Sequence, residues 1–344
     1  MAMHVGLIGA GNITETHARA ALAIPGVELT AIFGDNDDKV QRLGKEYGVA
    51  SYTDFNRFLD HRPMTFVVIG SPSGVHAAQG IEAARHGLHV LTEKPIDISA
   101  RKTDELILET DKAGVKLGVI YQDRFKPGIQ FLKQLYTSGK LGKPILAEAR
   151  VKWYRPPEYY SQSRWRGVTA ADGGGALMNQ GIHTVDLLLW LLGDVTAVQA
   201  QMKSALHKIE SEDTLTALLE FANGTMGTFI ATTSVYPGYP RRVELSGTEG
   251  TVILENDRVI QADLKTPSSQ PLTLEEADKN PSASSPLISD IRGHKAVMED
   301  FIRAIETGAI PACDGREGRR SVALVEAVYA AARTGKRVIL ETAR

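Results

Sequence analysis

Cysteine is nearly absent from this sequence, since Cys313 is the one cysteine among 344 residues. A disulfide framework within the chain is therefore excluded, and so are zinc sites built mainly from cysteine. Long apolar runs are also lacking, because the longest candidate, residues 187–192, falls far short of the ~20 residues that span a bilayer. Residues 1–5 carry no basic segment of the kind that begins an export signal. We therefore predict a cytoplasmic protein that does not enter membranes.

An excess of positive charge is lacking too. The chain holds 39 Lys and Arg against 41 Asp and Glu, for a formal net charge of -2. A protein that binds nucleic acid by neutralising phosphates needs a basic face. The longest basic runs here are the pairs Arg241–Arg242 and Arg319–Arg320. We therefore expect no nucleic-acid partner.

The length suggests two domains of about 150 residues each. Residues 4–121 alternate short apolar runs with amphipathic segments such as 37–47, 75–86 and 99–113. The apolar runs are 5–8, 29–33, 66–69, 88–91 and 117–120. Near-continuous apolar strands separated by helices predict a parallel sheet that is covered on both faces. Ser99 is the expected N-cap of the last helix.

After Arg124 the pattern changes. A helix over 126–137 precedes a series of predicted strands, 145–153, 195–202, 214–221, 225–233, 242–246 and 251–254. Asn223-Gly224 between two of them is a strong hairpin signal. The second half is therefore predicted to be a largely antiparallel sheet. Residues 266–285 are expected to form a mobile surface loop, followed by helices over 294–307 and 317–332 and a strand over 338–340.

The first turn reads Gly9-Ala10-Gly11-Asn12-Ile13-Thr14, between a predicted strand and a predicted helix. Glycines at such a turn let backbone N–H groups approach a pyrophosphate at the helix N-terminus. Thr14 stands at the third glycine position, so the dinucleotide fingerprint is incomplete and an ordinary turn remains an alternative.

An acidic residue after the second strand would bind the ribose 2′-hydroxyl of a dinucleotide. Asp35 occupies this position, in an acidic cluster that must also supply a helix N-cap. Because an acid disfavours a 2′-phosphate and no Arg is adjacent, NAD is the expected cofactor, with NADP possible.

Glu93-Lys94-Pro95 follows the apolar run 88–91. Because Pro95 biases Lys94 toward extended backbone, both charges are expected at the carboxyl edge of the sheet, where ligands of such folds bind. Taken alone, these residues are ordinary surface charges. Together with the glycine turn and Ser71-Pro72-x-x-x-His76, the tripeptide resembles the hallmark of the Gfo/Idh/MocA oxidoreductase family.

The resemblance covers essentially the whole chain, with further matches at 124–127, 138–144 and 173–186. It implies an NAD(P)-binding Rossmann domain over 1–124. It also implies an α+β domain over 125–344 with a large, mainly antiparallel open-faced sheet. This second domain would bind substrate and make the subunit contacts, and its last helices would pack back on the first domain.

In this family the lysine of Glu-Lys-Pro and the histidine of the Gly-x-His segment flank the substrate carbinol, which implies catalytic roles for Lys94 and His183. Asn179 stands where many members have Asp, and an amide binds a hydroxyl without exchanging a proton. His183 is therefore predicted to be the acid/base, and Lys94 the orienter and electrostatic partner of the carbinol oxygen. A lone helical histidine is often structural, but Asn179, His183 and Asp186 are spaced to share one helix face.

The resemblance implies hydride transfer between nicotinamide and a secondary alcohol of a sugar, inositol or sugar derivative. The predicted cofactor-binding residues are Gly9, Gly11, Asn12, Ile13, Asp35, Ser71, Pro72, His76, Glu93 and Lys94. The predicted substrate-binding residues are Tyr121, Arg124, Trp165, Arg166, Asn179 and His183, and no metal is expected.

Aromatic residues make up only 6% of the chain, yet they are dense over 153–165. Aromatic faces stack on sugar rings and Arg binds anions, although a packed loop is an equal alternative. The wording Tyr-Tyr…Trp-Arg-Gly and Met-Asn-Gln-Gly-Ile-His is similar to bacterial UDP-N-acetylglucosaminuronate dehydrogenases of this family. That activity, an NAD-dependent glycosidase and a non-catalytic NAD(P)-binding regulator are the alternative functions.

The family's open sheet usually pairs with that of another subunit. The strands over 225–233 and 242–246 carry enough apolar residues at alternate positions to need a covering layer. A homodimer or homotetramer formed through the open sheet is therefore expected.

Overall fold

The computed structural model describes residues 2–266 and 290–340. Its contacts divide the chain into two compact units, Met1–Gln122 with Leu287–Arg319, and Asp123–Pro286 with Arg320–Arg344. The sequence-based boundary follows residue 124, whereas the contact boundary follows Gln122. The predicted surface loop falls almost entirely on 267–289, outside the described residues.

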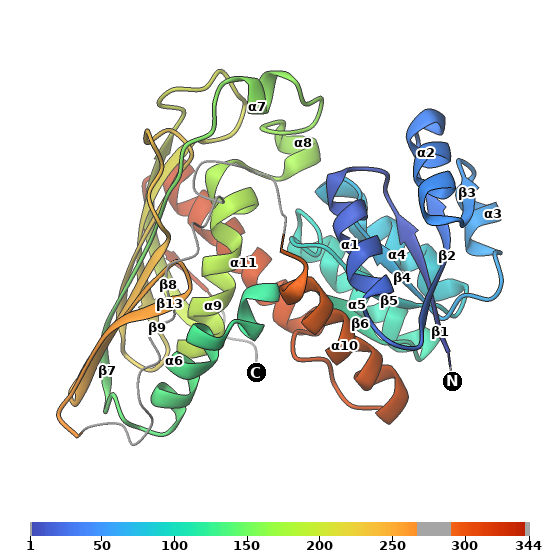
Figure 1. Cartoon of the computed structure of the whole chain (residues 1–344). Coiled ribbons are helices and arrows are strands. Elements are labelled where there is room, and N and C mark those ends of the chain that lie inside the picture. Colours follow the sequence, from blue (N-terminus) through green and yellow to red (C-terminus); the bar gives the residue numbers. More distant parts are fainter. Residues whose placement is uncertain (1, 267–289, 341–344) are drawn as a thin grey trace. The chain divides into compact units, whose positions relative to one another are not determined.

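The first unit contains a six-stranded sheet in the order β3-β2-β1-β4-β5-β6, and every paired strand is parallel. The strands are β1 (Met3–Ile8), β2 (Val27–Phe33), β3 (Ala50–Tyr52), β4 (Phe66–Ile69), β5 (His89–Thr92) and β6 (Leu117–Val119). The helices are α1 (Asn12–Leu22), α2 (Asp37–Tyr47), α3 (Phe55–Leu59), η1 (Ser73–Val75), α4 (His76–Arg85), α5 (Ala100–Ala113) and α10 (Arg292–Thr307). This strand order is that of a Rossmann fold, which confirms the predicted parallel sheet (Figure 1).

Local sequence explains the elements of this unit. All four residues of β4 are buried, as expected of a strand covered on both faces. The side chain of Asn36 caps α2 by accepting from the backbone N–H of Lys39 at 3.0 Å. The same helix ends at Gly48, which has a left-handed conformation. Ser99 is the N-cap residue of α5, but its side chain makes no capping hydrogen bond.

The second unit contains an eight-stranded sheet in the order β13-β12-β11-β7-β10-β9-β8-β14. Its pairs are antiparallel except for β7 with β10. The strands are β7 (Pro144–Lys152), β8 (Val195–Lys203), β9 (Thr214–Phe221), β10 (Met226–Thr232), β11 (Arg242–Gly247), β12 (Gly250–Glu255), β13 (Arg258–Leu264) and β14 (Val338–Ile339). The helices are η2 (Gln122–Phe125), α6 (Pro127–Thr137), α7 (Glu158–Ser161), α8 (Thr169–Asp172), η3 (Ala176–Gly181), α9 (Ile182–Leu192) and α11 (Gly315–Thr334). The division between the units falls at the start of η2 and within α11.

One face of this sheet packs against helices, and α6 and α9 lie along it in Figure 1. The strands alternate accordingly, so that β9 buries Leu215, Ala217, Leu219 and Phe221 and exposes the residues between them. Helix α9 is apolar on nearly all sides and is largely buried. The predicted antiparallel second domain is thus confirmed, including the hairpin at Asn223-Gly224 that joins β9 to β10.

Strand β13 was not predicted. It pairs with β12 through a tight turn at Asn256 and Asp257, both of which have positive φ (48° and 66°). Asn and Asp are the non-glycine residues that tolerate this conformation best. The Asn-Asp pair was therefore a usable hairpin signal.

Candidate active site

The turn between β1 and α1 has the shape of a phosphate-binding turn. Gly9 has a φ of +117°, and a Cβ there would lie 2.8 Å from the carbonyl oxygen of Gly70. Gly11 is the N-cap residue of α1, and within the described chain no side chain caps that helix start. A Cβ on Gly11 would meet nothing within 4 Å. Open space beside uncapped N–H groups at Asn12 and Ile13 fits a bound pyrophosphate.

Asp35 lies just beyond β2, and its side chain is exposed. Because Asn36 supplies the cap of α2, Asp35 is not needed for that role. Gly34 lets the end of β2 approach the glycine turn, since a Cβ there would lie 2.8 Å from the Cβ of Ala10. These positions fit the recognition of a ribose hydroxyl beside the pyrophosphate turn.

His76, a predicted cofactor-binding residue, has a positioning role. Its Nε2 lies 2.8 Å from the carbonyl oxygen of Ser71, and its Nδ1 lies 2.8 Å from that of Pro95. The ring is 1% exposed and thus joins the segments that follow β4 and β5. Ser71 itself donates its hydroxyl to Gln79 at 2.5 Å, and Pro72 precedes η1.

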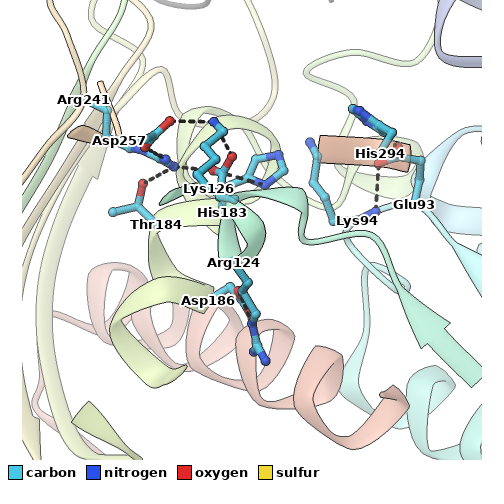
Figure 2. Close-up of polar contacts among 11 residues, drawn as sticks. Glu93, Lys94, Arg124, Lys126, His183, Thr184, Asp186, Arg241, Asp257 and His294 are labelled. Atoms are coloured by element: carbon cyan, nitrogen blue, oxygen red, sulfur yellow. Dashed lines mark hydrogen bonds and ion pairs between the residues drawn. The ribbon is translucent and has the colours of Figure 1, made fainter. Parts of the chain in front are cut away.

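The carboxylate of Glu93 sits in a buried cluster with two histidines, one of which is labelled with Glu93 and Lys94 in Figure 2. Glu93 Oε1 lies 3.2 Å from His17 Nε2 and 3.7 Å from His294 Nε2. Its Oε2 accepts the backbone N–H of Lys94 at 3.1 Å. Burial would raise the pKa of Glu93, but His17 and His294 hold it well below its usual range. The cluster therefore fixes the backbone that carries Lys94 to α1 and α10.

His183 lies in a charged network of the second unit. Its Nδ1 is 3.8 Å from Asp123 Oδ2. Asp123 also accepts from Arg241 Nη1 at 2.6 Å and lies 2.6 Å from Lys126 Nζ. Asp257 completes the network by binding both cations, as Figure 2 shows. Burial would raise the pKa of Asp123, but Arg241, Lys126 and His183 hold it well below its usual range.

The Asp123 carboxylate thus supplies a charge partner for His183 that the motif lacks at Asn179. An anion at this distance orients the imidazole and stabilises its protonated form. Neither Asp123 nor Arg241 was predicted from the sequence, because neither lies within a matched motif near His183. Asp123 does stand directly before Arg124-Phe125-Lys126-Pro127, which was the available signal.

Arg124, a predicted substrate contact, pairs with Asp186. Their side chains form a bidentate ion pair, with Arg124 Nε to Asp186 Oδ2 at 2.8 Å and Arg124 Nη2 to Asp186 Oδ1 at 2.6 Å. Both are 1–2% exposed, so this pair anchors η2 to α9. The pair occupies the fork of Arg124, and a substrate contact by this residue stays a prediction. Tyr121, another predicted substrate contact, is 1% exposed.

The segment that carries Asn179 is a π-helix, η3, rather than the predicted regular helix. Its wider turn alters the face expected from α-helical spacing, and π-helical turns often occur at functional sites. Asn179 Nδ2 donates to Asp172 Oδ1 at 2.8 Å, whereas His183 turns to Asp123. His183 and Asp186 lie on α9 and Asn179 lies on η3, and each has its own partner, so the shared face stays a prediction.

A buried carboxyl holds the start of η3. Glu212 accepts the backbone N–H of Gly175 at 2.9 Å, that of Leu177 at 2.8 Å and the hydroxyl of Tyr329 at 3.1 Å. Gly175 is required here, since a Cβ would lie 1.7 Å from the carbonyl oxygen of Glu212. Burial raises the pKa of Glu212 to about 7 despite these donors.

The aromatic segment before η3 is an arginine–aromatic cluster. The guanidinium of Arg166 lies 4.3 Å from the ring centroid of Tyr159 and 5.2 Å from that of Trp165. Arg155, 2% exposed, lies over Trp153 and Tyr159. Trp165 and Arg166 are part-buried. These contacts fit the packed-loop alternative, while sugar or anion binding by the segment stays a prediction.

Over residues 2–266 and 290–340, no group of three or more His, Cys, Asp or Glu side chains is arranged to hold a metal ion. In the same part of the chain, no helix is both long and apolar enough to cross a membrane.

Family models match both halves of the chain. Residues 3–121 match the oxidoreductase family model with an NAD-binding Rossmann fold, and residues 129–253 match the GFO/IDH/MocA C-terminal domain. Among curated proteins, the chain is 25% identical over 331 residues to the myo-inositol 2-dehydrogenase of Thermotoga maritima, with 94% of each covered.

Two solved structures resemble the chain over nearly its full length. One is the WlbA dehydrogenase of Bordetella pertussis in complex with NADH and UDP-GlcNAcA, at 32% identity, 99% coverage of both chains and a TM-score of 0.89. The other is its counterpart from Chromobacterium violaceum with the same ligands, at 30% identity, 99% and 97% coverage and a TM-score of 0.89. The chain therefore belongs to the Gfo/Idh/MocA family of NAD-binding oxidoreductases.

Proposed function

We propose that this protein oxidises a secondary alcohol on the sugar of a sugar nucleotide such as UDP-GlcNAcA, with NAD as the hydride acceptor. Curated relatives include dehydrogenases of inositol and apiose, which places the reaction among sugars and polyols. The observation that carries the finer assignment is the pair of full-length relatives bound to NADH and UDP-GlcNAcA at 32% and 30% identity. The arginine–aromatic cluster beside the π-helix supports an anionic substrate.

The first domain, residues 1–124, is proposed to hold the cofactor. The backbone N–H groups of Asn12 and Ile13 bind its pyrophosphate, and Asp35 binds a ribose hydroxyl. Asp35 is acidic and exposed, which favours NAD over NADP. When bound, the dinucleotide supplies the hydride acceptor for the alcohol carbon.

The second domain, residues 125–344, is proposed to hold the substrate. His183 removes the proton of the hydroxyl as the hydride leaves the carbon that bears this hydroxyl. Asp123 stabilises the imidazolium that forms. Lys94 binds the carbinol oxygen, and its ammonium stabilises the negative charge that develops there. Asn179 holds a neighbouring hydroxyl without exchanging a proton.

We further propose that the open face of the eight-stranded sheet pairs with another copy of the chain to form a dimer or tetramer. Leu218 and Met226 are 56% and 62% exposed on β9 and β10, and apolar side chains on an exposed sheet face favour a covering partner. A cytoplasmic location also stays a proposal.

The test is a substrate panel. Purified protein is incubated with NAD and UDP-GlcNAcA, UDP-GlcNAc, free uronic acids, inositols or simple sugars, and the reduced cofactor is followed by absorbance. The proposal expects turnover with UDP-GlcNAcA to exceed that with inositols and simple sugars. Turnover confined to an inositol or free sugar would reject the sugar nucleotide, while glycoside cleavage without net NADH would favour a glycosidase. NAD binding without any reaction would favour a regulator.

A further inference from the structure

Arg166 is a part-buried cation on the segment that precedes the π-helix. Within residues 2–266 and 290–340, its Nε–H is shielded from water and donates to no acceptor, and its side chain forms no ion pair. The rings of Tyr159 and Trp165 lie against it. Stacking on aromatic faces holds a guanidinium in one plane while leaving its in-plane N–H groups available.

Two buried arginines of this unit have carboxylate partners. Arg124 binds Asp186, and Arg241 binds Asp123 and Asp257. Removing a cation from water without an anion is costly. Arg166 therefore lacks the carboxylate partner that these two arginines have, and a bound anionic ligand would supply one.

Hydrogen bonds connect this arginine to the π-helix. The backbone N–H of Gly167, next to Arg166, donates to Asp172 Oδ2 at 2.9 Å, and Asp172 Oδ1 accepts from Asn179 at 2.8 Å. Gln180 Nε2 in turn donates to the hydroxyl of Tyr159 at 3.0 Å. The ring of Tyr159, which lies against Arg166, and the amide of Asn179 thus belong to one hydrogen-bonded network. This network includes the π-helix, which leads directly into His183.

We propose that Arg166 binds the anionic group of the substrate and so determines specificity for a charged sugar derivative. The inference rests on the proposed function and extends it by assigning the anion to one side chain. Carboxylate and phosphate oxygens both match the guanidinium fork, so the anion is either the sugar carboxylate or the diphosphate.

The experiment compares wild type with Arg166→Met, which keeps contact with the rings but removes the charge, and with Arg166→Lys, which keeps the charge but loses the fork. Arg164→Met is the matched control, because Arg164 is exposed on the same loop. We expect Arg166→Met to raise the KM for UDP-GlcNAcA by about 10²-fold, the usual effect of truncating one partner of a desolvated charge pair. Arg166→Lys should recover part of this loss, while Arg164→Met and NAD binding stay near wild type.

Substrate analogues identify the anion. If Arg166 binds the carboxylate, wild type prefers UDP-GlcNAcA over UDP-GlcNAc and Arg166→Met loses that preference. If Arg166 binds the diphosphate, the variant weakens both nucleotides equally and leaves the free uronic acid unaffected. An unchanged KM for all three would overturn the inference.

Calorimetric binding of UDP-GlcNAcA to the wild type and the Arg166 variants separates this inference from the proposed function. Tight binding by wild type that is lost in Arg166→Met, with no reduction of NAD, supports the anion site and rejects the oxidation. Oxidation that persists with unchanged affinity in Arg166→Met rejects the anion site alone. Absence of binding by wild type rejects the anion site as well.

Discussion

The environment of His183 is set by charges that come from distant parts of the sequence. Asp123 lies 3.8 Å from its Nδ1, and Arg241 and Lys126 each lie 2.6 Å from the same carboxylate. Because Arg241 and Lys126 are cations and Asp123 is the adjacent anion, the protonation of the imidazole depends strongly on Asp123. The balance predicts how catalysis depends on pH.

Asp123→Asn is expected to move the acid limb of the kcat/KM profile to lower pH by about one unit, and to lower the maximum rate. The reason is that the imidazolium loses its stabilising anion and faces Arg241 and Lys126, so a proton leaves it more easily. Asp257→Asn is the matched control, because Asp257 binds the same two cations and Asn tolerates its positive φ. An unchanged limb in Asp123→Asn, or an equal shift in both variants, would contradict this role for Asp123.

At this scale, the sequence located the residues that have a local signal. Gly9, Gly11, Glu93 and Lys94 could be predicted because a turn or a tripeptide marks them. His17, His294 and Asp123 were missed, since each acts through a contact between segments that are remote along the chain. A motif also marked Arg124, but it could not show that this side chain pairs with Asp186 on another helix.

At the scale of elements, the N-terminus of α1 is the part that we propose binds the cofactor. Gly11→Val is expected to weaken NAD binding by at least about tenfold, because the new side chain enters the space that we assign to the pyrophosphate. A Cβ meets nothing within 4 Å there, and the φ of -97° suits any residue, so the melting temperature without NAD should hardly change. Fluorescence titration with NADH and thermal unfolding measure the two effects. Wild-type affinity in this variant would argue against the assigned position.

The π-helix η3 depends on a carboxyl whose folded-state pKa is raised by burial to about 7. A folded state that holds this proton more tightly than the unfolded chain gains stability at low pH and loses it as the pH rises through about 7. Glu212→Gln lacks the titrating group. The melting temperature of wild type minus that of Glu212→Gln should therefore decrease between pH 5 and 8. A constant difference across this range would show that Glu212 does not titrate as inferred.

Element prediction succeeded where patterns are long and failed where geometry is unusual. The parallel strands and the hairpin at Asn223-Gly224 follow from apolar runs and turn chemistry. The short β3 (Ala50–Tyr52) carries too few residues to show a period. The π-helix was predicted as a regular helix. Its first backbone N–H groups, at Gly175, Leu177 and Met178, donate to the side chains of Glu212 and Tyr329. Both acceptors are remote along the chain, so the local sequence does not show them.

For the whole molecule, the open sheet face predicts the oligomeric state. Leu218→Asp is expected to shift the mass measured by light scattering toward the monomer, because a buried carboxylate at a subunit contact has no partner. Leu108→Asp on α5 is the matched control, as its side chain is 54% exposed compared with 56% for Leu218. A wild-type protein that is monomeric at all concentrations would contradict a subunit contact on this face.

The central claim is that one hydroxyl-bearing carbon gives its hydride to NAD while His183 takes the proton and Lys94 holds the oxygen. The direct measurement uses UDP-GlcNAcA deuterated on the ring carbons, with mass spectrometry of cofactor extracted from the protein. We predict a single deuterium on the reduced cofactor for each sugar oxidised, at a rate that falls ~10²–10⁴-fold in Lys94→Met and in His183→Ala while NADH affinity is retained. Reduced cofactor without deuterium, or label transferred at the wild-type rate by both variants, would contradict the account.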